Sequence, residues 1–500
     1  MIPRPRLPDF KNIAYYSGKI VFGVGLLMLI PLTIALIFQE WNPALNFLIG
    51  MFSCFIVGLS LQIFFYSESD LNWRQGLVIT SFSWILATAL GAIPHYLSGH
   101  FGSYLDACFD LMSGYTTTGL YLLQDLDHIS YALNTWRHVL SYAGGQGIIV
   151  IALTFLVRGT GGAFKMYVAE GKEEKLLPNI IQTARAIWLI SLSYLAIGWT
   201  ILTSVAIWEG MSPVRGILHG FWVFMGAWST GGFAPQSFNL SYYHSFLFEL
   251  ATIVLFTVGS FNFALHWAIW TGNKKEIFRN IEIVSFCVTI TVALITTSVG
   301  LMRLNVYPGL TALFRKGFYH VISGHTTTGF MTIQSRVFVK QWGEMAMLGV
   351  AIAMAIGASA CSTAGGFKGL RMGIIFKALI QDIRKMLSPE TAVIIEKFHH
   401  IKDAALNEKH VRGATLIVIS FIVSYAFATI VGVYFGYPLV EALFDGISAG
   451  SNTGLSCGVV SPAMPSLMKI VYIIVMWLGR LEFMSIFTLI GFMIVAVRGK

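Results

Sequence analysis

The sequence predicts an all-α polytopic membrane protein built from four copies of one unit, and three observations lead to this fold class. Hydrophobic residues make up 56% of the 500 residues and charged residues only 11%, whereas soluble chains carry about 25% charged residues. Long apolar stretches recur along the chain, and short glycine-bearing segments lie between them. This composition excludes a cytosolic enzyme, a disordered protein and a nucleic-acid binder, although the formal net charge is +9.

Ten apolar stretches are long enough to cross a bilayer, which takes about 20 residues. They lie near 20–38, 44–66, 76–98, 136–157, 184–208, 245–271, 281–302, 343–376, 413–435 and 467–497. The first is too long for the apolar core of a signal peptide, so we expect it to be retained as a helix. Lys and Arg gather at the amino terminus and in the loops after even-numbered spans, which places both termini in the cytoplasm. The natural partner of these basic loops is the anionic lipid surface.

Cysteine and histidine usage predicts no cofactor and no transition-metal site. The five cysteines are scattered, and no two of them form a Cys-x-x-Cys pair. His399 and His400 are adjacent in a charged loop, where a solvated surface is favoured over a metal site.

One short segment occurs four times between the long spans. Each copy has a glycine at the same place, a large apolar residue after it, and an aromatic residue four positions before the segment. The copies read SGYTTTGL at 113–120, GAWSTGGF at 226–233, SGHTTTGF at 323–330 and SAGSNTGL at 448–455. The stretches leading into them, about 104–113, 215–226, 312–323 and 438–448, are too short to cross a bilayer. We predict four half-length helices, each ending in a Thr-rich glycine turn.

A second glycine recurs 25 to 28 residues after the first, where it opens a polar patch inside the next apolar span. The patches are GGQG at 144–147, GSFNF at 259–263, GASAC at 357–361 and GRLEF at 479–483. Each unit therefore reads helix, half-helix, turn, helix. We divide the chain into an amino-terminal two-helix extension, residues 1–70, and four units, residues 71–180, 181–280, 281–411 and 412–500.

Irregular backbone at membrane depth is tolerated only where it is packed in protein or lines a water-filled cavity. Four equivalent turns satisfy this condition if they gather around one axis, with the negative carboxyl ends of the half-helices aimed at a common point. Rings of backbone carbonyls select alkali cations by replacing their hydration shell. The alternative is that glycine and threonine only allow close helix packing. Carboxylates beside the first and fourth turns would form an acidic outer mouth or an ordinary solvated loop: Asp106, Asp110, Asp125, Asp127, Glu441 and Asp445.

The span 343–376 is too long for one plain crossing and contains the run GASACSTAGGFKG at 357–369. We interpret part of this run as an intramembrane loop that narrows the pathway below the turns; the alternative is a close-packed helix. The loop residues are Gly357, Ala358, Ser359, Ala360, Cys361, Ser362, Thr363, Ala364, Gly365 and Gly366. Lys368 and Arg371 are expected near the cytoplasmic edge, where long side chains reach water.

Arg480 lies about a dozen residues into the last span, where a buried guanidinium costs at least about 3 kcal/mol without compensation. Glu482 is on another face of the same helix and is not an obvious partner. We expect Arg480 to point into the central axis, meet carbonyls of the 357–366 loop and repel cations as part of a gate. A structural interhelical ion pair is the alternative.

With the four glycine turns, the broken third-unit span and Arg480, the sequence resembles the Trk/Ktr potassium-uptake superfamily over residues 70–500. The resemblance implies four helix–pore-helix–helix units around a central pore, in the bacterial cytoplasmic (inner) membrane, with K⁺ as the transported ion. The two extra amino-terminal spans indicate the TrkH-like bacterial branch. The family also implies a homodimer and a cytoplasmic nucleotide-binding regulatory ring of TrkA type. The basic loops 158–185, 272–280 and 377–412 are candidate docking surfaces, or simply the positive loops of a cytoplasmic face.

The resemblance, carried over position by position, implies a potassium-binding filter made of three residues from each turn. These are Thr117, Thr118 and Gly119; Thr230, Gly231 and Gly232; Thr327, Thr328 and Gly329; and Asn452, Thr453 and Gly454. Relatives with serine at the first glycine lean towards sodium, so Gly119 implies potassium. The second and fourth turns depart from the Thr-Thr-Thr pattern, which predicts a filter without full four-fold uniformity.

The sequence therefore predicts potassium uptake by a channel-like pore with a carbonyl filter and an intramembrane gate, and no enzymatic activity. A coupled potassium–proton or potassium–sodium symporter stays open as an alternative, although no buried carboxylate or histidine relay stands out along the spans. A membrane enzyme or haem protein is disfavoured, because His138, His266 and His320 do not form ligand pairs and no nucleophile–base motif occurs.

Overall fold

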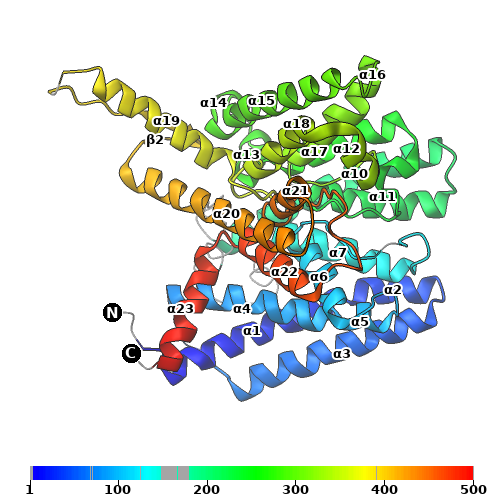
Figure 1. Cartoon of the computed structure of the whole chain (residues 1–500). Coiled ribbons are helices and arrows are strands. Elements are labelled where there is room, and N and C mark those ends of the chain that lie inside the picture. Colours follow the sequence, from blue (N-terminus) through cyan, green and yellow to red (C-terminus); the bar gives the residue numbers. More distant parts are fainter. Residues whose placement is uncertain are drawn as a thin grey trace.

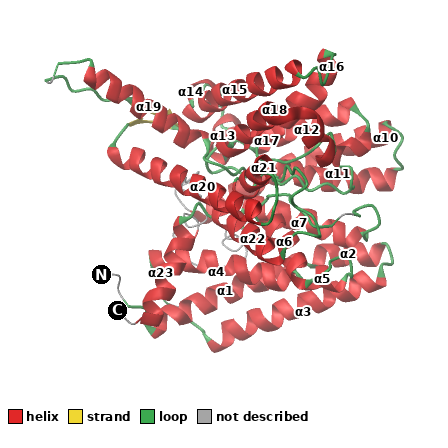
Figure 2. Ribbon diagram, in the orientation of Figure 1, coloured by secondary structure: helices red, strands yellow, loops and turns green. Residues whose placement is uncertain are grey.

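The computed structural model describes residues 4–67, 69, 71–123, 125–147, 166, 180–389 and 391–498. Within these ranges the regular structure is helical apart from one two-stranded hairpin (Figure 2). Seven of the described helices are long and apolar enough to cross a membrane, or up to nine spans if two bent helix pairs each count as one. The all-α polytopic fold class is confirmed.

The amino-terminal extension is a helical hairpin packed against the rest of the chain. It consists of α1 (Leu7–Leu27), α2 (Leu29–Ile37) and α3 (Trp41–Phe64). Gly18 and Gly58 bring α1 and α3 close together, because a Cβ on either glycine would lie within 3 Å of the other's carbonyl oxygen. Glu40 then joins the extension to the next unit by accepting hydrogen bonds from the first amides of α7, those of Tyr131 (2.7 Å) and Ala132 (3.0 Å).

The remaining elements follow the predicted order of helix, half-helix and helix. The first unit has α4 (Trp73–Gly91), α5 (Ile93–Leu97), α6 (Tyr104–Tyr115) and α7 (Tyr131–Gln146). The second has α10 (Ile180–Trp208), α11 (Pro213–Trp228), η1 (Asn239–Tyr243), α12 (Phe246–Gly259), α13 (Phe263–Trp270) and α14 (Glu276–Arg279). The third has α15 (Ile281–Arg303), α16 (Leu310–Ala312), the π-helical η2 (Leu313–Phe318), α17 (Tyr319–His325), α18 (Ser335–Ile356) and α19 (Gly369–Met386). The fourth has α20 (Glu408–Tyr434), α21 (Leu439–Gly450), α22 (Ser466–Arg480) and α23 (Met484–Arg498).

Four half-length helices occur where the sequence predicts them: α6, α11, the continuous α16–η2–α17 segment and α21. Ser103 caps the start of α6 by accepting from the Asp106 amide at 3.2 Å, and Pro213 occupies the first turn of α11. At 12 residues, α6 and α21 extend about 18 Å, which is too short to cross the hydrocarbon core.

In the second, third and fourth units the second long helix is not continuous, and here two of the predicted spans need correction. Spans 245–271 and 467–497 are wrong as single helices, because α12 and α13 meet at 96° and α22 and α23 at 115°. The interruption expected within 343–376 is present, between the end of α18 and the start of α19. Predicted span 136–157 begins within α7 and continues outside the described residues.

Both chain ends lie at the same end of the molecule as the far tip of α19, at the left of Figure 1. The turn between α10 and α11 lies at the opposite end (Figure 1). Beyond α19, strands β1 (Lys397–His400) and β2 (Lys402–Ala405) pair antiparallel, and Phe398 packs into a small apolar cluster with Ile281 and Ile374. We call residues 397–405 the β1–β2 hairpin.

Candidate functional site

The four half-helices end in the same hydrogen-bonded turn. In each, a backbone amide donates to the carbonyl five residues earlier, at the first residue of the repeated segment. These bonds run from Thr118 to Ser113 (2.8 Å), from Gly231 to Gly226 (2.9 Å), from Thr328 to Ser323 (2.8 Å) and from Thr453 to Ser448 (2.9 Å). The preceding amides donate to the second segment residue: Thr117 to Gly114, Thr230 to Ala227, Thr327 to Gly324 and Asn452 to Ala449. This pair of bonds is the Schellman ending of a helix. We call residues 116–119, 229–232, 326–329 and 451–454 the glycine turns.

Two residues of every glycine turn have left-handed backbone conformations. The shared glycines have φ of 85°, 61°, 82° and 93° at Gly119, Gly232, Gly329 and Gly454. Two positions earlier, φ is 56°, 49°, 53° and 55° at Thr117, Thr230, Thr327 and Asn452. A β-branched residue in this region is rare and costs of order 1–3 kcal/mol, and such residues cluster at functional sites.

The glycine turns touch one another in a closed cycle. A Cβ added to Gly119 would collide with the carbonyl oxygen of Gly231 in the second turn, and one added to Gly232 with that of Thr328 in the third. The cycle continues from Gly329 to the carbonyl of Thr453, and from Gly454 back to the carbonyl of Thr118. Each shared glycine therefore combines a positive φ with a backbone contact that leaves no room for a side chain.

Side-chain bonds within the turns are similar but not identical. Hydroxyl pairs join Thr116 to Thr118 (2.7 Å), Thr326 to Thr328 (2.8 Å) and Ser451 to Thr453 (2.7 Å). The second turn has glycine at the position of the second hydroxyl, and its Ser229 pairs with Ser141 of α7 instead (2.8 Å). The Asn452 amide reaches the neighbouring first turn, at Thr118 Oγ1 (3.0 Å). The four turns share a backbone without being chemically uniform.

The recurring second glycine lets the following helix approach the end of its half-helix. A Cβ on Gly144, Gly259 or Gly479 would collide with the carbonyl oxygen of Tyr115, Trp228 or Gly450, the last residue of α6, α11 or α21. In the third unit Gly357 instead meets Gly365 of its own loop. In every unit a described helix ends within two residues of this glycine, at Gln146, Gly259, Ile356 and Arg480, whereas the sequence predicted a break only in the third.

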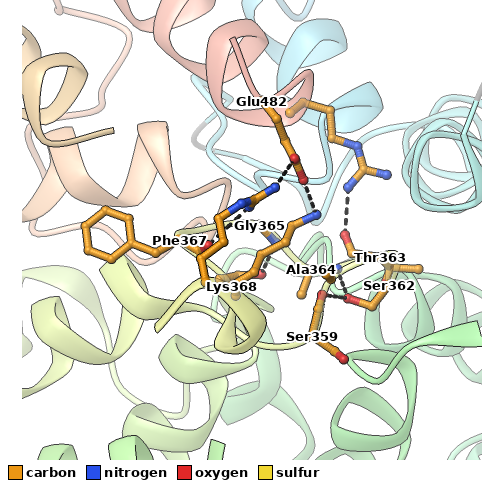
Figure 3. Close-up of polar contacts among 12 residues, drawn as sticks. Ser359, Ser362, Thr363, Ala364, Gly365, Phe367, Lys368 and Glu482 are labelled. Atoms are coloured by element: carbon orange, nitrogen blue, oxygen red, sulfur yellow. Dashed lines mark hydrogen bonds and ion pairs between the residues drawn. The ribbon is translucent and has the colours of Figure 1, made fainter. Parts of the chain in front are cut away.

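The 357–366 loop contacts all four glycine turns. The Thr230 hydroxyl donates to Thr363 Oγ1 (3.1 Å), the Thr117 hydroxyl lies 3.4 Å from the Thr363 carbonyl, and the Gly365 amide donates to Thr327 Oγ1 (2.8 Å). In the fourth turn, a Cβ on Gly365 would collide with the Ser451 carbonyl. Figure 3 shows Thr363 and Gly365 in the same loop as Ser359 and Ser362. The loop thus lies directly against the ring of turns.

Arg480, at the end of α22, is nearly buried and meets the loop where the sequence predicts. Its Nη1 donates to the Thr363 carbonyl at 2.7 Å, and its Nη2 donates to the Gly144 carbonyl at 2.5 Å. The guanidinium therefore joins the 357–366 loop to the helix break of the first unit. Several backbone carbonyls offset part of the cost of burying this charge.

A buried ion cluster below the loop was not anticipated from the sequence. Glu482, in the bend between α22 and α23, pairs with Lys368 Nζ at 2.6 Å and with the Arg371 guanidinium. Figure 3 shows Lys368 and Glu482 pointing toward each other. The sequence predicted that Lys368 and Arg371 extend towards water at the cytoplasmic edge, whereas Lys368 is only 7% exposed and both cations are held by Glu482.

Of the six carboxylates that could form an acidic outer mouth or a solvated loop, three are buried in the structure. Asp106 is buried against Lys469 (2.6 Å), and Asp110 is buried against Arg137 and His95 (3.1 Å each). Asp445 is buried and accepts from the Ser456 hydroxyl (2.8 Å) and the Cys457 amide (2.6 Å). These three carboxylates hold half-helices α6 and α21 in place and are not a solvated ring.

The other residues singled out in the sequence, two carboxylates and the adjacent histidines, lie outside the ring of glycine turns. Asp125 is solvent-exposed and pairs with His128, and Glu441 is half-buried. His399 binds Glu276 and Asp403, and His400 lies near Asn280. Among the described residues, no group of three or more His, Cys, Asp or Glu side chains is arranged to hold a metal ion. Most of the candidate docking loop 158–185 lies outside the described residues.

Comparisons with known proteins agree with this architecture. The model of a family described as TrkH, cation transport protein, matches residues 43–494. An uncharacterized cation transporter of Methanocaldococcus jannaschii is 29% identical over 96% of this chain and 95% of its own length. The Trk system potassium uptake protein TrkH of Escherichia coli is 28% identical over 96% and 98%. The crystal structure of the potassium transporter TrkH from Vibrio parahaemolyticus superposes with a TM-score of 0.78, at 25% identity, over 96% of this chain and 98% of that chain.

Proposed function

This chain belongs to the TrkH family of cation transport proteins, which are multi-pass membrane proteins and not enzymes, and on that premise we propose that it takes up potassium through a channel-like pore. The four units would surround one central pathway. Its selectivity filter would be the ring of glycine turns, and its gate the 357–366 loop with Arg480.

The closed cycle of contacts among the glycine turns carries this proposal. Four helix carboxyl ends, each equivalent to about −0.5 charge, meet at one ring, which favours a cation there. The Schellman bonds use only carbonyls of the half-helices, while the hydroxyls of Thr117 and Thr230 donate to the carbonyls of Thr116 and Ser229. The carbonyls of the last three residues of each turn are therefore the potential ligands. A ring of such oxygens can replace the hydration shell of an alkali cation.

Position by position, the filter would comprise Thr117–Gly119, Thr230–Gly232, Thr327–Gly329 and Asn452–Gly454. Glycine at all four shared positions supports potassium as the preferred ion, as does the potassium uptake attributed by name to the Escherichia coli relative. The strained backbone and close packing at these positions would hold the ring at a fixed size, which is what distinguishing two cations of equal charge requires.

The gate assignment rests on where the loop and Arg480 lie. The loop sits against all four turns, so it would obstruct an ion leaving the ring. Arg480 adds a positive charge to the same place. Opening would require the loop to leave the ring and the Arg480–Thr363 bond to break.

Orientation and partners complete the proposal. The excess of Lys and Arg supports a location of both termini and the β1–β2 hairpin in the bacterial cytoplasm. As a Trk-system protein, the chain would work as a homodimer with a TrkA-like nucleotide-binding ring on the cytoplasmic side. The loops 272–280 and 377–412 would offer that ring a basic surface beside anionic lipid.

The test is ion flux into proteoliposomes, measured separately for potassium, rubidium and sodium. We expect wild-type flux to favour potassium, and a reversal potential that follows the potassium gradient alone. A reversal potential that follows protons or sodium would replace simple conduction by coupled symport.

Two substitutions test the filter and the gate separately. Gly119→Ser should erode the preference for potassium over sodium, whereas Gly436→Ser, which has a similar φ of 87° with nothing within 4 Å, should not. Arg480→Ala should raise flux, whereas Arg498→Ala at the exposed end of α23 should not. Unchanged selectivity in Gly119→Ser would remove the filter assignment, and unchanged flux in Arg480→Ala would remove the gate assignment.

A further inference from the structure

We propose that Glu282 is a positioning residue for the gate, and that the β1–β2 hairpin fixes where Glu282 lies. The inference rests on the proposed function, because it assigns a control point to the 357–366 loop. Glu282 binds the loop directly, at Ser359 and Ala360. Its influence, and that of the hairpin through it, would therefore fall on gate position and not on ion preference.

Glu282 holds the start of the 357–366 loop. It lies in the first turn of α15, and its carboxylate accepts from the Ala360 amide at 2.6 Å and from the Ser359 hydroxyl. Glu282 is 2% exposed and Ser359 is 3% exposed. A buried carboxylate is costly unless it is well hydrogen-bonded, so these bonds strongly favour the loop conformation that supplies the two donors.

The loop has no helix or strand of its own, so side-chain contacts decide where it sits. Glu282 binds residues 359 and 360, and Arg480 binds the carbonyl of Thr363. Ser359 also donates its amide to the Ser260 carbonyl, in the break between α12 and α13 (3.2 Å). Glu282 thus anchors the first part of the loop, three to four residues before its contact with Arg480.

The hairpin reaches Glu282 through an unbroken run of polar contacts. His399 Nε2 lies 3.0 Å from Glu276, which also accepts from the Ile401 amide at 3.1 Å. Asn280 Nδ2 donates to the Glu276 carboxylate (3.0 Å), while Asn280 Oδ1 accepts from the backbone amide of Glu282 (3.0 Å).

His400 gives the hairpin a second and more direct approach. Its Nδ1 lies 3.3 Å from Asn280 Oδ1 and 3.9 Å from the Glu282 carboxylate. Movement of the hairpin would therefore disturb the cap of α15 and the carboxylate that holds the loop. A double-mutant cycle measures the coupling between hairpin and loop along this run of contacts.

The experiment compares wild type, Glu282→Gln, His400→Ala and the double variant in proteoliposomes. Glu282→Gln keeps the shape of the side chain but removes its charge. We expect it to raise potassium flux by about five-fold or more, the scale of a typical coupling between sites, with an unchanged potassium-to-sodium ratio. His400→Ala should raise flux less, and the double variant should match Glu282→Gln. Lys402→Ala, on the exposed side of the hairpin, is the matched control and should behave as wild type.

Amide hydrogen exchange of residues 357–366 in the full chain gives a readout that does not depend on ion flux. Exchange should be faster in both single variants than in Lys402→Ala. Independent, additive effects of the two substitutions on exchange or flux would overturn the inference, as would a changed ion ratio in Glu282→Gln. If wild type carries no potassium, the proposed function fails, while the exchange cycle still decides whether hairpin and loop are coupled.

Discussion

The ring of glycine turns and the segments directly beneath it are built differently, although both derive from the same four units. In the ring, every unit contributes the same Schellman ending, the same two left-handed residues and the same contact to its neighbour. Beneath the ring, the units diverge: three helices press a glycine against the end of a half-helix, while the third unit inserts a ten-residue loop. The charged side chains that bind this loop or its end come from the third and fourth units.

The difference between the repeated ring and the unequal segments beneath it indicates that ion coordination needs symmetry and gating does not. Coordinating a single ion on an axis calls for equal contributions from all sides, so the backbone of the ring is repeated. Opening and closing calls for one element with two positions, and one loop suffices for that. Buried charges at Arg480, Glu282 and Glu482 are expensive to place, and each is directed at the loop or its carboxyl end.

The largest effect is expected from a substitution that makes one of the four glycine turns different from the others. Gly329→Ala would force a Cβ into the Thr453 carbonyl at a position with φ of 82°. We expect potassium flux in proteoliposomes to fall by about ten-fold or more, because strain of order 1–3 kcal/mol adds to a backbone overlap that the packed ring cannot relax. Alanine at Gly119, Gly232 or Gly454 should have a similar effect.

The matched control is Gly436→Ala, which has a φ of 87° but no atom within 4 Å of the new Cβ. It should keep most of the flux. If alanine is tolerated at one shared glycine and not at the others, the four positions are not equivalent, which would contradict the symmetry of the ring.

The second prediction concerns the segments beneath the ring and tests the ion cluster at Glu482. Glu482→Gln leaves Lys368 and Arg371 buried without their shared carboxylate, a change that typically costs about 3–5 kcal/mol. We expect a lower unfolding temperature because of these unpaired charges. We also expect a higher potassium flux, because Lys368 lies two residues after the end of the loop and would no longer be held by Glu482. Glu344→Gln, at an exposed position of α18, should change neither.

A double variant separates charge from packing in this cluster. Combining Glu482→Gln with Lys368→Gln should cost less stability than the sum of the single changes, because one buried cation is removed with its partner. Additive losses would mean that the cluster is not a cooperative ion pair, and would remove it from the account of the gate.

The symmetric half could be predicted from the sequence, whereas most of the asymmetric half could not. Four copies of one segment predict the half-helices, the turns and the need for glycine at Gly119 and its equivalents, because repetition makes a local pattern visible. The helix breaks in the second and fourth units were missed, because an apolar run with a short polar patch resembles a continuous span until its partners are known.

Partners distant in sequence account for the other errors. Glu282 is 77 residues from Ser359, and Glu482 is 111 residues from Arg371, so no spacing rule links them. Asp106 was assigned to an outer mouth or a solvated loop, and its burial was missed because its partner, Lys469, lies 363 residues away. Burial of a charge is decided by such pairs, and one sequence does not reveal them.

The smallest expected effect concerns pH and the hairpin beneath the loop, a feature of the third unit. His399 binds Glu276 through Nε2 (3.0 Å) and Asp403 through Nδ1 (2.6 Å); Arg279 lies 3.8 Å from Asp403. These hydrogen bonds, the one to Glu276 first, raise the pKa of His399 above its usual 6.5. Although burial opposes it, the bond from His399 helps to lower the pKa of Glu276, which stays ionised.

Only protonated His399 can donate from both ring nitrogens, so the hairpin should be fully held below about pH 6.5 and loosen as pH rises through the raised pKa. We expect amide exchange in residues 397–405, corrected for its intrinsic pH dependence, to speed up by about two- to five-fold across that window, the scale of a partly exposed ion pair. His399→Gln should remove this dependence while leaving exchange in the glycine turns unchanged. If the turns respond to the same titration, the ring is not insulated from the segments beneath it, and the division between a fixed ring and an adjustable gate would have to be abandoned.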